Sequence, residues 1–522
     1  MRRRDAIAAI VLLGLAACAE PGVRATRAND LTVTTSTDAA PATTTSSVPI
    51  DEPLVSTIAW TECDDDYVFG TVHECATLDV PLDYDDPGGE QLTLALVRVP
   101  ATEPRVGAIL YNPGGPGGSG FSGIGLDGRY YQRQMGLEMF DIVGFDPRGV
   151  DRSNGIRCLD DAFIDEHLYI DYSPDTSEEQ ELFREALEGF AAACVERYGD
   201  TLRHYSTANT ARDMDMIRAA MGDQQLSFIG ISYGTYLGGV YATMFPERVR
   251  AMVLDSASVP YAYDTATDEV YLGYAMAAEY AFDAWASWCE ETASCAFTAA
   301  DVGERWDALW AQLEEQPVVA ADGRLAHTSV MYWALAQASY DEDTWPELAE
   351  ALADVANGDA EGLFDLADAY HGRSPDGTFD TSDQSFQVIN CASGFEDPPL
   401  DDPYGLIEQI IAEAPRFARY YTLERLQLLS QGCDGVARGE TIVEIDYAGD
   451  GPIIVANSLY DPITPYLGAV RMLQDLGPNA QIVRNDDPRH GQILSDDCVT
   501  ELEAAVLVSL ELPDRAVNCY DE

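Results

Sequence analysis

The stretch Leu226-Ser-Phe-Ile-Gly-Ile-Ser232-Tyr-Gly-Thr-Tyr-Leu-Gly238 decides the fold of this chain. A mostly apolar run leads into Gly230-Ile-Ser-Tyr-Gly234, and helix-compatible residues follow. A serine flanked by two glycines, with a strand before it and a helix after it, is typical of a tight turn that exposes the serine hydroxyl above a sheet. Larger side chains beside the serine would clash in such a turn. The pattern therefore predicts that Ser232 is a nucleophile.

A nucleophilic serine needs a base to take its proton and an acid to orient that base. Two later apolar runs, 451–456 and 480–484, read as strands, and Asp461 and His490 lie in the loops that follow them. Because the carboxyl ends of parallel strands meet at one edge of a sheet, these side chains are expected beside Ser232. The spacing predicts His490 as the base and Asp461 as the acid. Three other acids remain alternatives to Asp461: Asp255, Asp486 and Asp487.

An oxyanion intermediate needs two backbone N–H groups that are fixed before the reaction. The residue after the nucleophile, Tyr233, is one expected donor. The other is expected from the loop Asn112-Pro-Gly-Gly115-Pro-Gly-Gly-Ser-Gly120, where glycine permits a close backbone approach, and we assign it to Gly115. This loop lacks the Gly-Lys-Ser/Thr of a phosphate-binding loop, and its prolines remove donors.

Strand and helix patterns alternate along the first half of the chain. Strands are expected at 75–84, 91–99, 106–111, 140–145, 226–231 and 250–255, and helices over 177–198 and 207–221. This alternation predicts an α/β fold with a mostly parallel sheet and helices on both faces. Between 264 and 435 the pattern is helix after helix without a convincing strand, which predicts a helical cap inserted between the sixth and seventh strands.

The N-terminus has the features of an export signal. A basic start, Met1-Arg-Arg-Arg4, precedes an apolar run too short to span a bilayer, which needs about 20 residues. The run ends Leu15-Ala-Ala-Cys18, which resembles a bacterial lipobox with Cys18 as the lipid-bearing residue; an ordinary secretory signal is the alternative. We predict a lipoprotein signal peptide (1–17), a Thr/Ser/Pro-rich tether (18–55), a first core part (56–263), the cap (264–435) and a second core part (436–522).

Export also explains the use of cysteine. With Cys18 set aside, ten cysteines remain, an even number that suits an oxidising compartment. Sequence cannot fix their pairing, but closeness along the chain suggests Cys63–Cys75, Cys158–Cys194, Cys289–Cys295, Cys391–Cys433 and Cys498–Cys519. No cysteine or histidine spacing resembles a metal site, so neither a metal nor another cofactor is expected.

The charge balance restricts the partners. The chain has 90 acidic and 30 basic residues, all of the latter arginine, and a net charge of −60. Such a surface repels nucleic acid and anionic headgroups, so membrane contact is expected only through the lipid. Solubility, tolerance of high salt and a preference for cationic substrates all remain open explanations. A monomer is the default expectation.

Four motifs together resemble a known family. They are Asn112-Pro-Gly-Gly-Pro-Gly-Gly-Ser-Gly120, Phe145-Asp-Pro-Arg-Gly149, the run from Thr207 to Gly238, and Asp461-Pro-Ile-Thr-Pro465. They are similar to the tripeptidyl-aminopeptidase-like branch of the α/β-hydrolases, within the prolyl-aminopeptidase family of serine peptidases. The resemblance implies the α/β-hydrolase fold, a triad of Ser232, Asp461 and His490, oxyanion donors at Gly115 and Tyr233, and cleavage of short peptides from a free N-terminus.

One departure from the family pattern concerns the substrate. The branch is expected to carry Cys-x-Asp in the cap, whereas this chain has Cys391-Ala-Ser393. Carboxylates of the cap that would bind a substrate ammonium group are Glu396, Asp397, Asp268, Glu269 and Glu279. An exported aminopeptidase that releases di- or tripeptides is the first hypothesis, a carboxylesterase the second, and a non-catalytic cell-envelope binding protein the third.

Overall fold

The computed structural model describes residues 57–520, apart from 65–67, 69–71, 172–173, 175, 260–266, 396–399, 401, 422–432, 434 and 440–441. The predicted signal peptide (1–17), Cys18 and the whole predicted tether (18–55) lie outside the described residues. No helix in the described part of the chain combines the length and the apolarity that crossing a membrane requires.

One sheet organises the described residues, with ten strands in the order β1-β2-β3-β5-β4-β6-β7-β10-β11-β12. β1, β2, β3 and β5 pair antiparallel in succession, whereas every pairing from β5 to β12 is parallel. The mostly parallel sheet of the sequence prediction is confirmed. The strands are β1 (Thr61–Glu62), β2 (Glu74–Pro81), β3 (Gln91–Val99), β4 (Gly107–Asn112), β5 (Phe140–Phe145), β6 (Leu226–Ile231), β7 (Val249–Asp255), β10 (Ile453–Ser458), β11 (Ala480–Asn485) and β12 (Val517–Asn518).

Helices cover both faces of this sheet, as the alternation of strands and helices predicted. On one face, α5 (Thr207–Ala220), α6 (Tyr233–Met244) and α15 (Tyr466–Leu476) bury side chains such as Met214, Val240 and Met472. On the other face, α2 (Gly120–Gln134) and α16 (Asp497–Ser509) bury Ile124 and Val506. The central strands β4 and β5 are buried along their whole length because both faces are covered.

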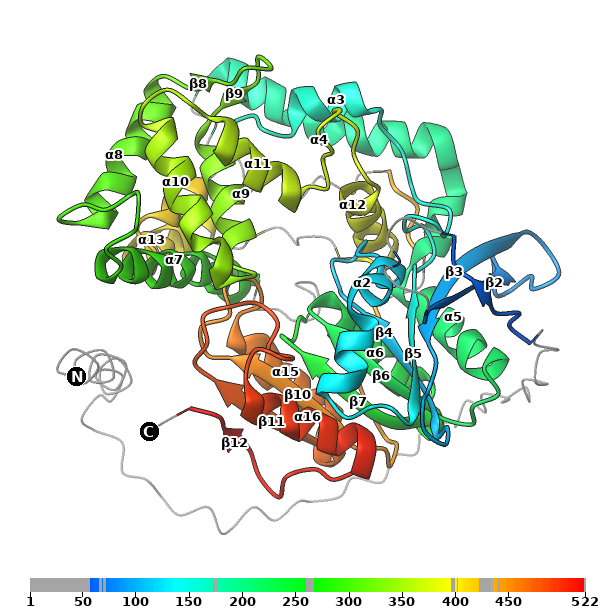
Figure 1. Cartoon of the computed structure of the whole chain (residues 1–522). Helices are drawn as coiled ribbons and strands as arrows, with labels where there is room; N and C mark the ends of the chain where they lie inside the picture. Colours follow the sequence, from blue (N-terminus) through cyan, green and yellow to red (C-terminus); the bar gives the residue numbers. More distant parts are fainter. Residues whose placement is uncertain are drawn as a thin grey trace, which may run out of the picture. The chain divides into compact units, whose positions relative to one another are not determined.

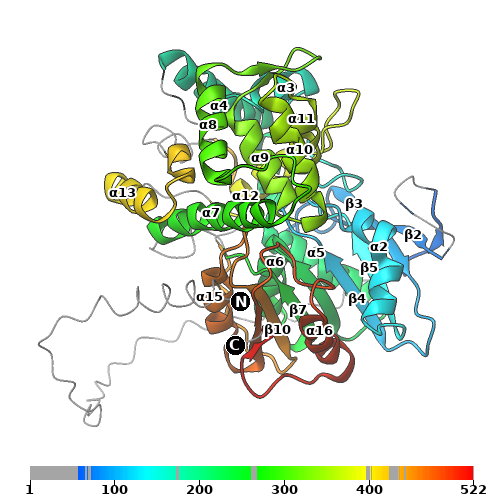
Figure 2. The ribbon, with the colours of Figure 1, turned by 60° about the vertical axis from the view of Figure 1, so that its left-hand side comes forward.

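A second group of helices is inserted between β7 and β10, which are the sixth and seventh strands when β2 is counted as the first. Its core is rich in aromatic side chains, including Trp285, Trp306 and Phe364. The helices are α7 (Thr267–Glu291), α8 (Val302–Glu315), α9 (Thr328–Ala338), α10 (Trp345–Val355), α11 (Glu361–Tyr370), α12 (Ser382–Ala392) and α13 (Pro403–Glu413). We call this group the cap. Figures 1 and 2 both show most of it above the sheet.

The expectation of a cap without strands was wrong. β8 (Val318–Val319) and β9 (Leu325–Ala326) form a small antiparallel hairpin inside it. Gly323 lies in its turn with φ +95°. Two-residue strands are too short to show any alternation of apolar and polar residues, so this hairpin has no recognisable sequence pattern.

Two helices that precede β6 in the chain pack with the cap. α3 (Asp161–His167) and α4 (Ser177–Tyr198) lie beside the cap helices in both ribbon views (Figures 1 and 2). After α3, the ring of Tyr169 packs on Phe364, and its hydroxyl donates to Asp368. The helices of this region therefore come from two parts of the chain: α3 and α4 precede Ser232, and the cap helices follow it.

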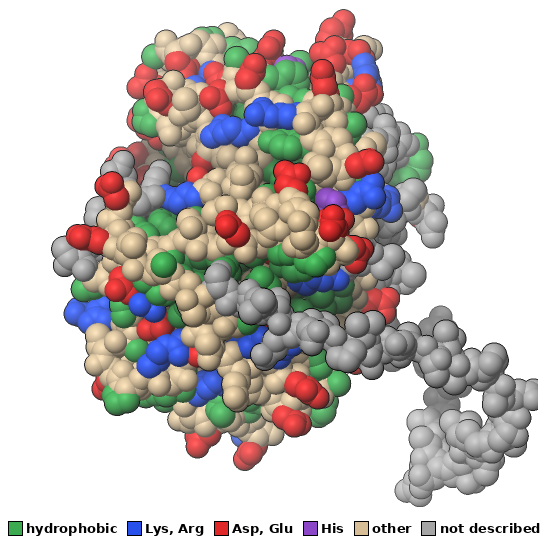
Figure 3. All heavy atoms as spheres, turned by 90° about the vertical axis from the view of Figure 1, so that its right-hand side faces the viewer, with side chains coloured by type: hydrophobic (Ala, Val, Ile, Leu, Met, Phe, Trp, Pro, Cys, Tyr) green, Lys and Arg blue, Asp and Glu red, His purple; other side chains and the backbone are tan. Residues whose placement is uncertain are grey.

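Five disulfides join the ten cysteines of the described residues. The pairs are the same as those that closeness along the chain suggested: Cys63–Cys75, Cys158–Cys194, Cys289–Cys295, Cys391–Cys433 and Cys498–Cys519. The Cys391–Cys433 bond joins the end of α12 to the chain that returns toward the sheet. On the face seen in Figure 3, acidic side chains are scattered rather than gathered in one patch, with arginines among them.

Candidate active site

Ser232 lies at the apex of the turn between β6 and α6. Its backbone has φ 57° and ψ −127°, a conformation that non-glycine residues rarely adopt and that marks strain at functional sites. Close backbone approaches hold the turn. A Cβ on Gly230 would lie 2.3 Å from the carbonyl oxygen of Gly234, and one on Gly234 would lie 2.7 Å from that of Asn112. Glycine is thus required on both sides of the serine, as the sequence pattern predicted.

His490 and Asp461 meet at the carboxyl edge of the sheet. The Nδ1 atom of His490 lies 3.0 Å and 3.2 Å from the two carboxylate oxygens of Asp461. Asp461 is fixed in turn, because its Oδ1 accepts the backbone N–H groups of Ile463 and Thr464 at 2.9 and 2.7 Å. This arrangement orients the imidazole and leaves Nε2 as the nitrogen that Asp461 does not engage, as the base of a serine triad requires.

The alternative acid Asp255 has a different position. Its carboxylate accepts the N–H groups of Gln492 and Ile493, at 2.8 and 2.7 Å, in the loop that follows His490. Its backbone carbonyl accepts the N–H of Ser232 at 2.9 Å. Burial raises the pKa of Asp255 to about 6. Asp255 therefore joins the Ser232 turn to the loop that follows His490, a positioning role that the sequence did not indicate.

The two remaining alternative acids are directed elsewhere. Asp487 accepts from Arg489 at 3.0 Å, and Asp486 is exposed. Among the described carboxylates, only Asp461 is hydrogen-bonded to His490. The geometry thus favours Ser232, His490 and Asp461 as the triad.

The glycine-rich loop after β4 lies against the serine turn. A Cβ on Gly114 would come within 2.8 Å of the Ser232 Cβ and 3.2 Å of the Tyr233 nitrogen. The Gly114 N–H is engaged by the Asn112 side chain at 3.0 Å, whereas the Gly115 N–H makes no hydrogen bond to a described residue. Tyr233 is the first residue of α6, so its N–H has no partner within the helix. Gly115 and Tyr233 remain our proposed oxyanion donors.

Two parts of the chain match known protein families. Residues 107–356 match the α/β hydrolase fold family, and residues 426–519 match the family of TAP-like proteins. Serine protease Hip1 of Mycobacterium tuberculosis is 32% identical over 85% of this chain and 87% of its own length. The chain belongs to the TAP-like α/β-hydrolases.

Two further relatives of this TAP-like hydrolase differ in their named activities. Tripeptidyl aminopeptidase of Streptomyces lividans is 29% identical over 88% of this chain and 86% of its own length. Carboxylesterase B of Mycobacterium tuberculosis is 32% identical over 85% and 86%. Together with Hip1 these relatives establish that the TAP-like hydrolase is a serine hydrolase with peptidase relatives.

The structure does not favour Glu279 as a residue that binds substrate. This carboxylate is buried and accepts both the backbone N–H of Arg416, at 3.0 Å, and its guanidinium, at 2.8 Å. Burial is the largest influence on its pKa, which is raised. Glu279 is thus occupied by an internal ion pair. Glu396 and Asp397 lie outside the described residues, and Asp268 and Glu269 belong to α7 with side chains that are not described.

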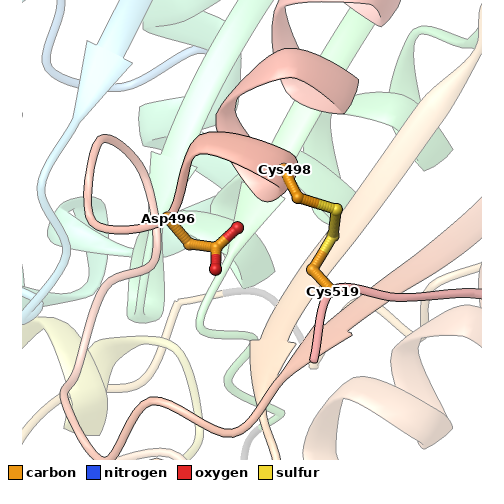
Figure 4. Close-up of side chains that lie close together, drawn as sticks. All are labelled: Asp496, Cys498 and Cys519. Atoms are coloured by element: carbon orange, nitrogen blue, oxygen red, sulfur yellow. A yellow bond between two sulfur atoms is a disulfide. The ribbon is translucent and has the colours of Figure 1, made fainter. Parts of the chain in front are cut away.

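One cluster has the composition of a metal site but cannot act as one. Asp496, Cys498 and Cys519 lie close together at the start of α16 (Figure 4). The two cysteines form a disulfide, so they offer no thiolate. The Asp496 carboxylate instead caps α16 by accepting the Val499 N–H at 2.9 Å.

Ser393, which stands where the family pattern has an acid, belongs to a buried hydroxyl network. Its Oγ accepts the Thr207 backbone N–H at 2.9 Å and lies 2.9 Å from Thr207 Oγ1. Thr207 Oγ1 in turn lies 2.7 Å from the Tyr233 hydroxyl. The end of α12 is therefore connected, through Thr207, to the residue whose N–H is a proposed oxyanion donor.

Replacing Ser393 with alanine is expected to lower the free energy of unfolding by about 1–3 kcal/mol, because the buried Thr207 N–H loses its acceptor. It should also lower kcat, because the hydroxyl network that holds the Tyr233 side chain through Thr207 loses one member. Ser385→Ala is the matched control: this hydroxyl of α12 donates to the Gly149 carbonyl at 2.6 Å, away from Tyr233. Denaturant titration and steady-state kinetics measure both effects. An equal kcat for the two variants would contradict the proposed link to Tyr233.

Proposed function

We propose that this TAP-like hydrolase is an extracytoplasmic aminopeptidase that releases di- or tripeptides from free N-termini through an acyl-enzyme on Ser232. The observation that carries the proposal is the His490–Asp461 pair, at 3.0 Å, on the sheet edge that also presents the Ser232 turn. The likeness to tripeptidyl aminopeptidase over 88% of the chain supports the peptide substrate.

The proposed reaction follows from these side chains. His490 takes the Ser232 proton as Oγ attacks the scissile carbonyl, and Asp461 stabilises the imidazolium that forms. The N–H groups of Gly115 and Tyr233 bind the oxyanion of the tetrahedral intermediate. His490 then gives its proton to the leaving amine, and the ester on Ser232 remains. Water, deprotonated by His490, hydrolyses that ester and restores the serine.

Location and anchoring belong to the same proposal. Five disulfides suit an oxidising compartment and so indicate an extracytoplasmic protein. We propose that Cys18 carries a lipid that attaches the protein to the outer face of the cell membrane, with 18–55 as the tether. A monomer without a nucleic-acid partner is the simplest form of the proposal, given the net charge of −60.

A carboxylesterase is the second candidate function. The likeness to Carboxylesterase B, 32% over 85% of the chain, favours it specifically. The same serine, histidine and acid serve ester hydrolysis, because both reactions pass through an acyl-enzyme. The geometry of the triad therefore does not separate the two functions.

The experiment compares tripeptide anilides with a free or an acetylated N-terminus and short-chain esters. The free anilide is expected to have a kcat/KM at least about tenfold higher than the acetylated one, because a charge-assisted contact to the ammonium group is worth about 1.5–3 kcal/mol. Equal cleavage of free and acetylated peptides would contradict the aminopeptidase proposal. Turnover of the esters alone would establish the carboxylesterase in its place.

A further inference from the structure

The cap touches the proposed catalytic histidine directly. The backbone N–H of His490 donates to the carbonyl of Ser339, the C-cap residue that follows α9, at 3.2 Å. The ring of the next residue, Tyr340, meets the His490 imidazole edge to face, with centroids 5.3 Å apart and an interplanar angle of 88°. In this pair the histidine is 7% exposed and the tyrosine 41%. Of these two rings, that of Tyr340 is therefore the one with substantial exposed surface.

The far end of Tyr340 is anchored in the cap. Its ring lies against that of Tyr370, with centroids 6.3 Å apart, and the Tyr370 ring packs on Trp333 with centroids 4.8 Å apart. Desolvation, followed by the negative charge of Asp461, raises the pKa of Tyr340 to about 12. The phenol thus stays neutral at physiological pH. Tyr340 offers a fixed, uncharged aromatic surface.

We propose that Tyr340 contacts the leaving group and makes the enzyme prefer a large apolar or aromatic residue immediately after the scissile bond. The inference rests on the proposed function and names the substrate class on its leaving side. His490 must lie within hydrogen-bond reach of the leaving nitrogen to protonate it. The side chain of that leaving residue therefore passes the ring that packs on the imidazole. An aromatic ring favours apolar and aromatic neighbours over small or anionic ones.

The test uses tetrapeptide amides, Ala-Ala-Ala-Xaa, with Phe, Leu, Gly or Asp as the leaving residue. The unmodified enzyme is expected to prefer Phe and Leu. Tyr340→Ala should lower kcat/KM for the Phe peptide about five- to tenfold, which lies within the roughly two- to twelvefold range of an aromatic pair, and leave the Gly peptide within about twofold. Tyr340→Phe should keep the preference because it keeps the ring.

Two controls separate a specificity role from a structural one. Tyr404, a cap tyrosine 67% exposed on α13, provides the matched variant Tyr404→Ala, which should not change the preference. The rate at which a fluorophosphonate labels Ser232 needs the triad but no leaving residue, so it should be the same in Tyr340→Ala. An equal loss for all four peptides would overturn the proposal and leave Tyr340 as a support for His490. An unchanged preference would overturn it as well.

An ester pair keeps this test distinct from that of the peptidase function. Benzyl and methyl esters of one acyl group differ only in their leaving alcohol. If no peptide is cleaved but both esters are, the peptidase function is rejected. The ratio of benzyl to methyl ester turnover then tests whether Tyr340 contacts the leaving group. A benzyl preference that disappears in Tyr340→Ala supports the proposal; an unaltered ratio rejects it. Turnover of neither the peptides nor the esters would reject both proposals.

Discussion

Replacement of Ser232 by alanine is expected to lower kcat about a millionfold, to the level left by binding and the oxyanion donors alone. The reason is that no other group at the apex of the β6–α6 turn can form the acyl-enzyme. His490→Ala should cost about as much, and the double variant no more than either, because the two residues act as one unit. Steady-state and single-turnover kinetics measure these losses.

Ser227→Ala is the control for Ser232→Ala. Ser227 is also a buried serine of β6, but its hydroxyl accepts from Arg250 at 3.3 Å and takes no part in the proposed reaction. This variant should react with a fluorophosphonate at the normal rate, whereas Ser232→Ala should not react. If Ser232→Ala keeps more than about one hundredth of the activity, the nucleophile is a different residue.

Replacement of Asp213 by alanine is expected to destabilise the fold by about 3–5 kcal/mol, because it leaves the buried Arg148 charge without a partner. Neither side chain is exposed, and Asp213 binds the guanidinium through both oxygens, at 2.7 and 2.6 Å. The other guanidinium hydrogens go to the carbonyls of Pro81, Leu82 and His204. Denaturant unfolding with the disulfides intact measures the loss.

A second variant keeps this prediction testable if Asp213→Ala does not fold. Asp213→Asn retains the shape and one acceptor, so it should be destabilised less than alanine. Arg184→Ala is the surface comparison: Arg184 pairs with Glu181 and with Glu188, the latter at 2.6 Å, but its side chain is 35% exposed and those of both glutamates are more than half exposed. It should change stability little, since exposed ion pairs contribute little. Equal losses for Asp213→Ala and Arg184→Ala would contradict the role of burial.

The sequence predicted those parts of the fold and site that rest on local signals. The Ser232 turn and the ends of β6, β10 and β11 could be predicted from short apolar runs, glycines and loop positions. These signals are properties of a few consecutive residues. The topological rule for parallel strands then places Asp461 and His490 at one edge. Their hydrogen bond across 29 residues needed no further information than this rule.

The parts that could not be predicted depend on contacts between distant segments. From the sequence, Glu279 is a cap carboxylate without an assigned partner. In the structure it accepts a hydrogen bond from Arg416, which is 137 residues away in the chain. Asp255 reads as an alternative acid, yet its carboxylate binds the main chain of the histidine loop, 237 residues on. Neither pairing leaves a trace in local composition, because both partners are ordinary residues in their own surroundings. Tyr340 beside His490 is a third case of this kind.

The contacts of the cap limit how its substrate preference can be re-engineered. Ser339 and Tyr340 contact His490, and Ser393 is linked to Tyr233 through Thr207. A Cβ on Gly117 of the glycine-rich loop would lie 2.4 Å from the carbonyl oxygen of Ser382 on α12. Exchanging the whole cap for that of a relative would thus alter turnover together with selectivity. A graft that retains these three junctions and replaces only the segments between them would change the substrate while the proton transfer stays intact.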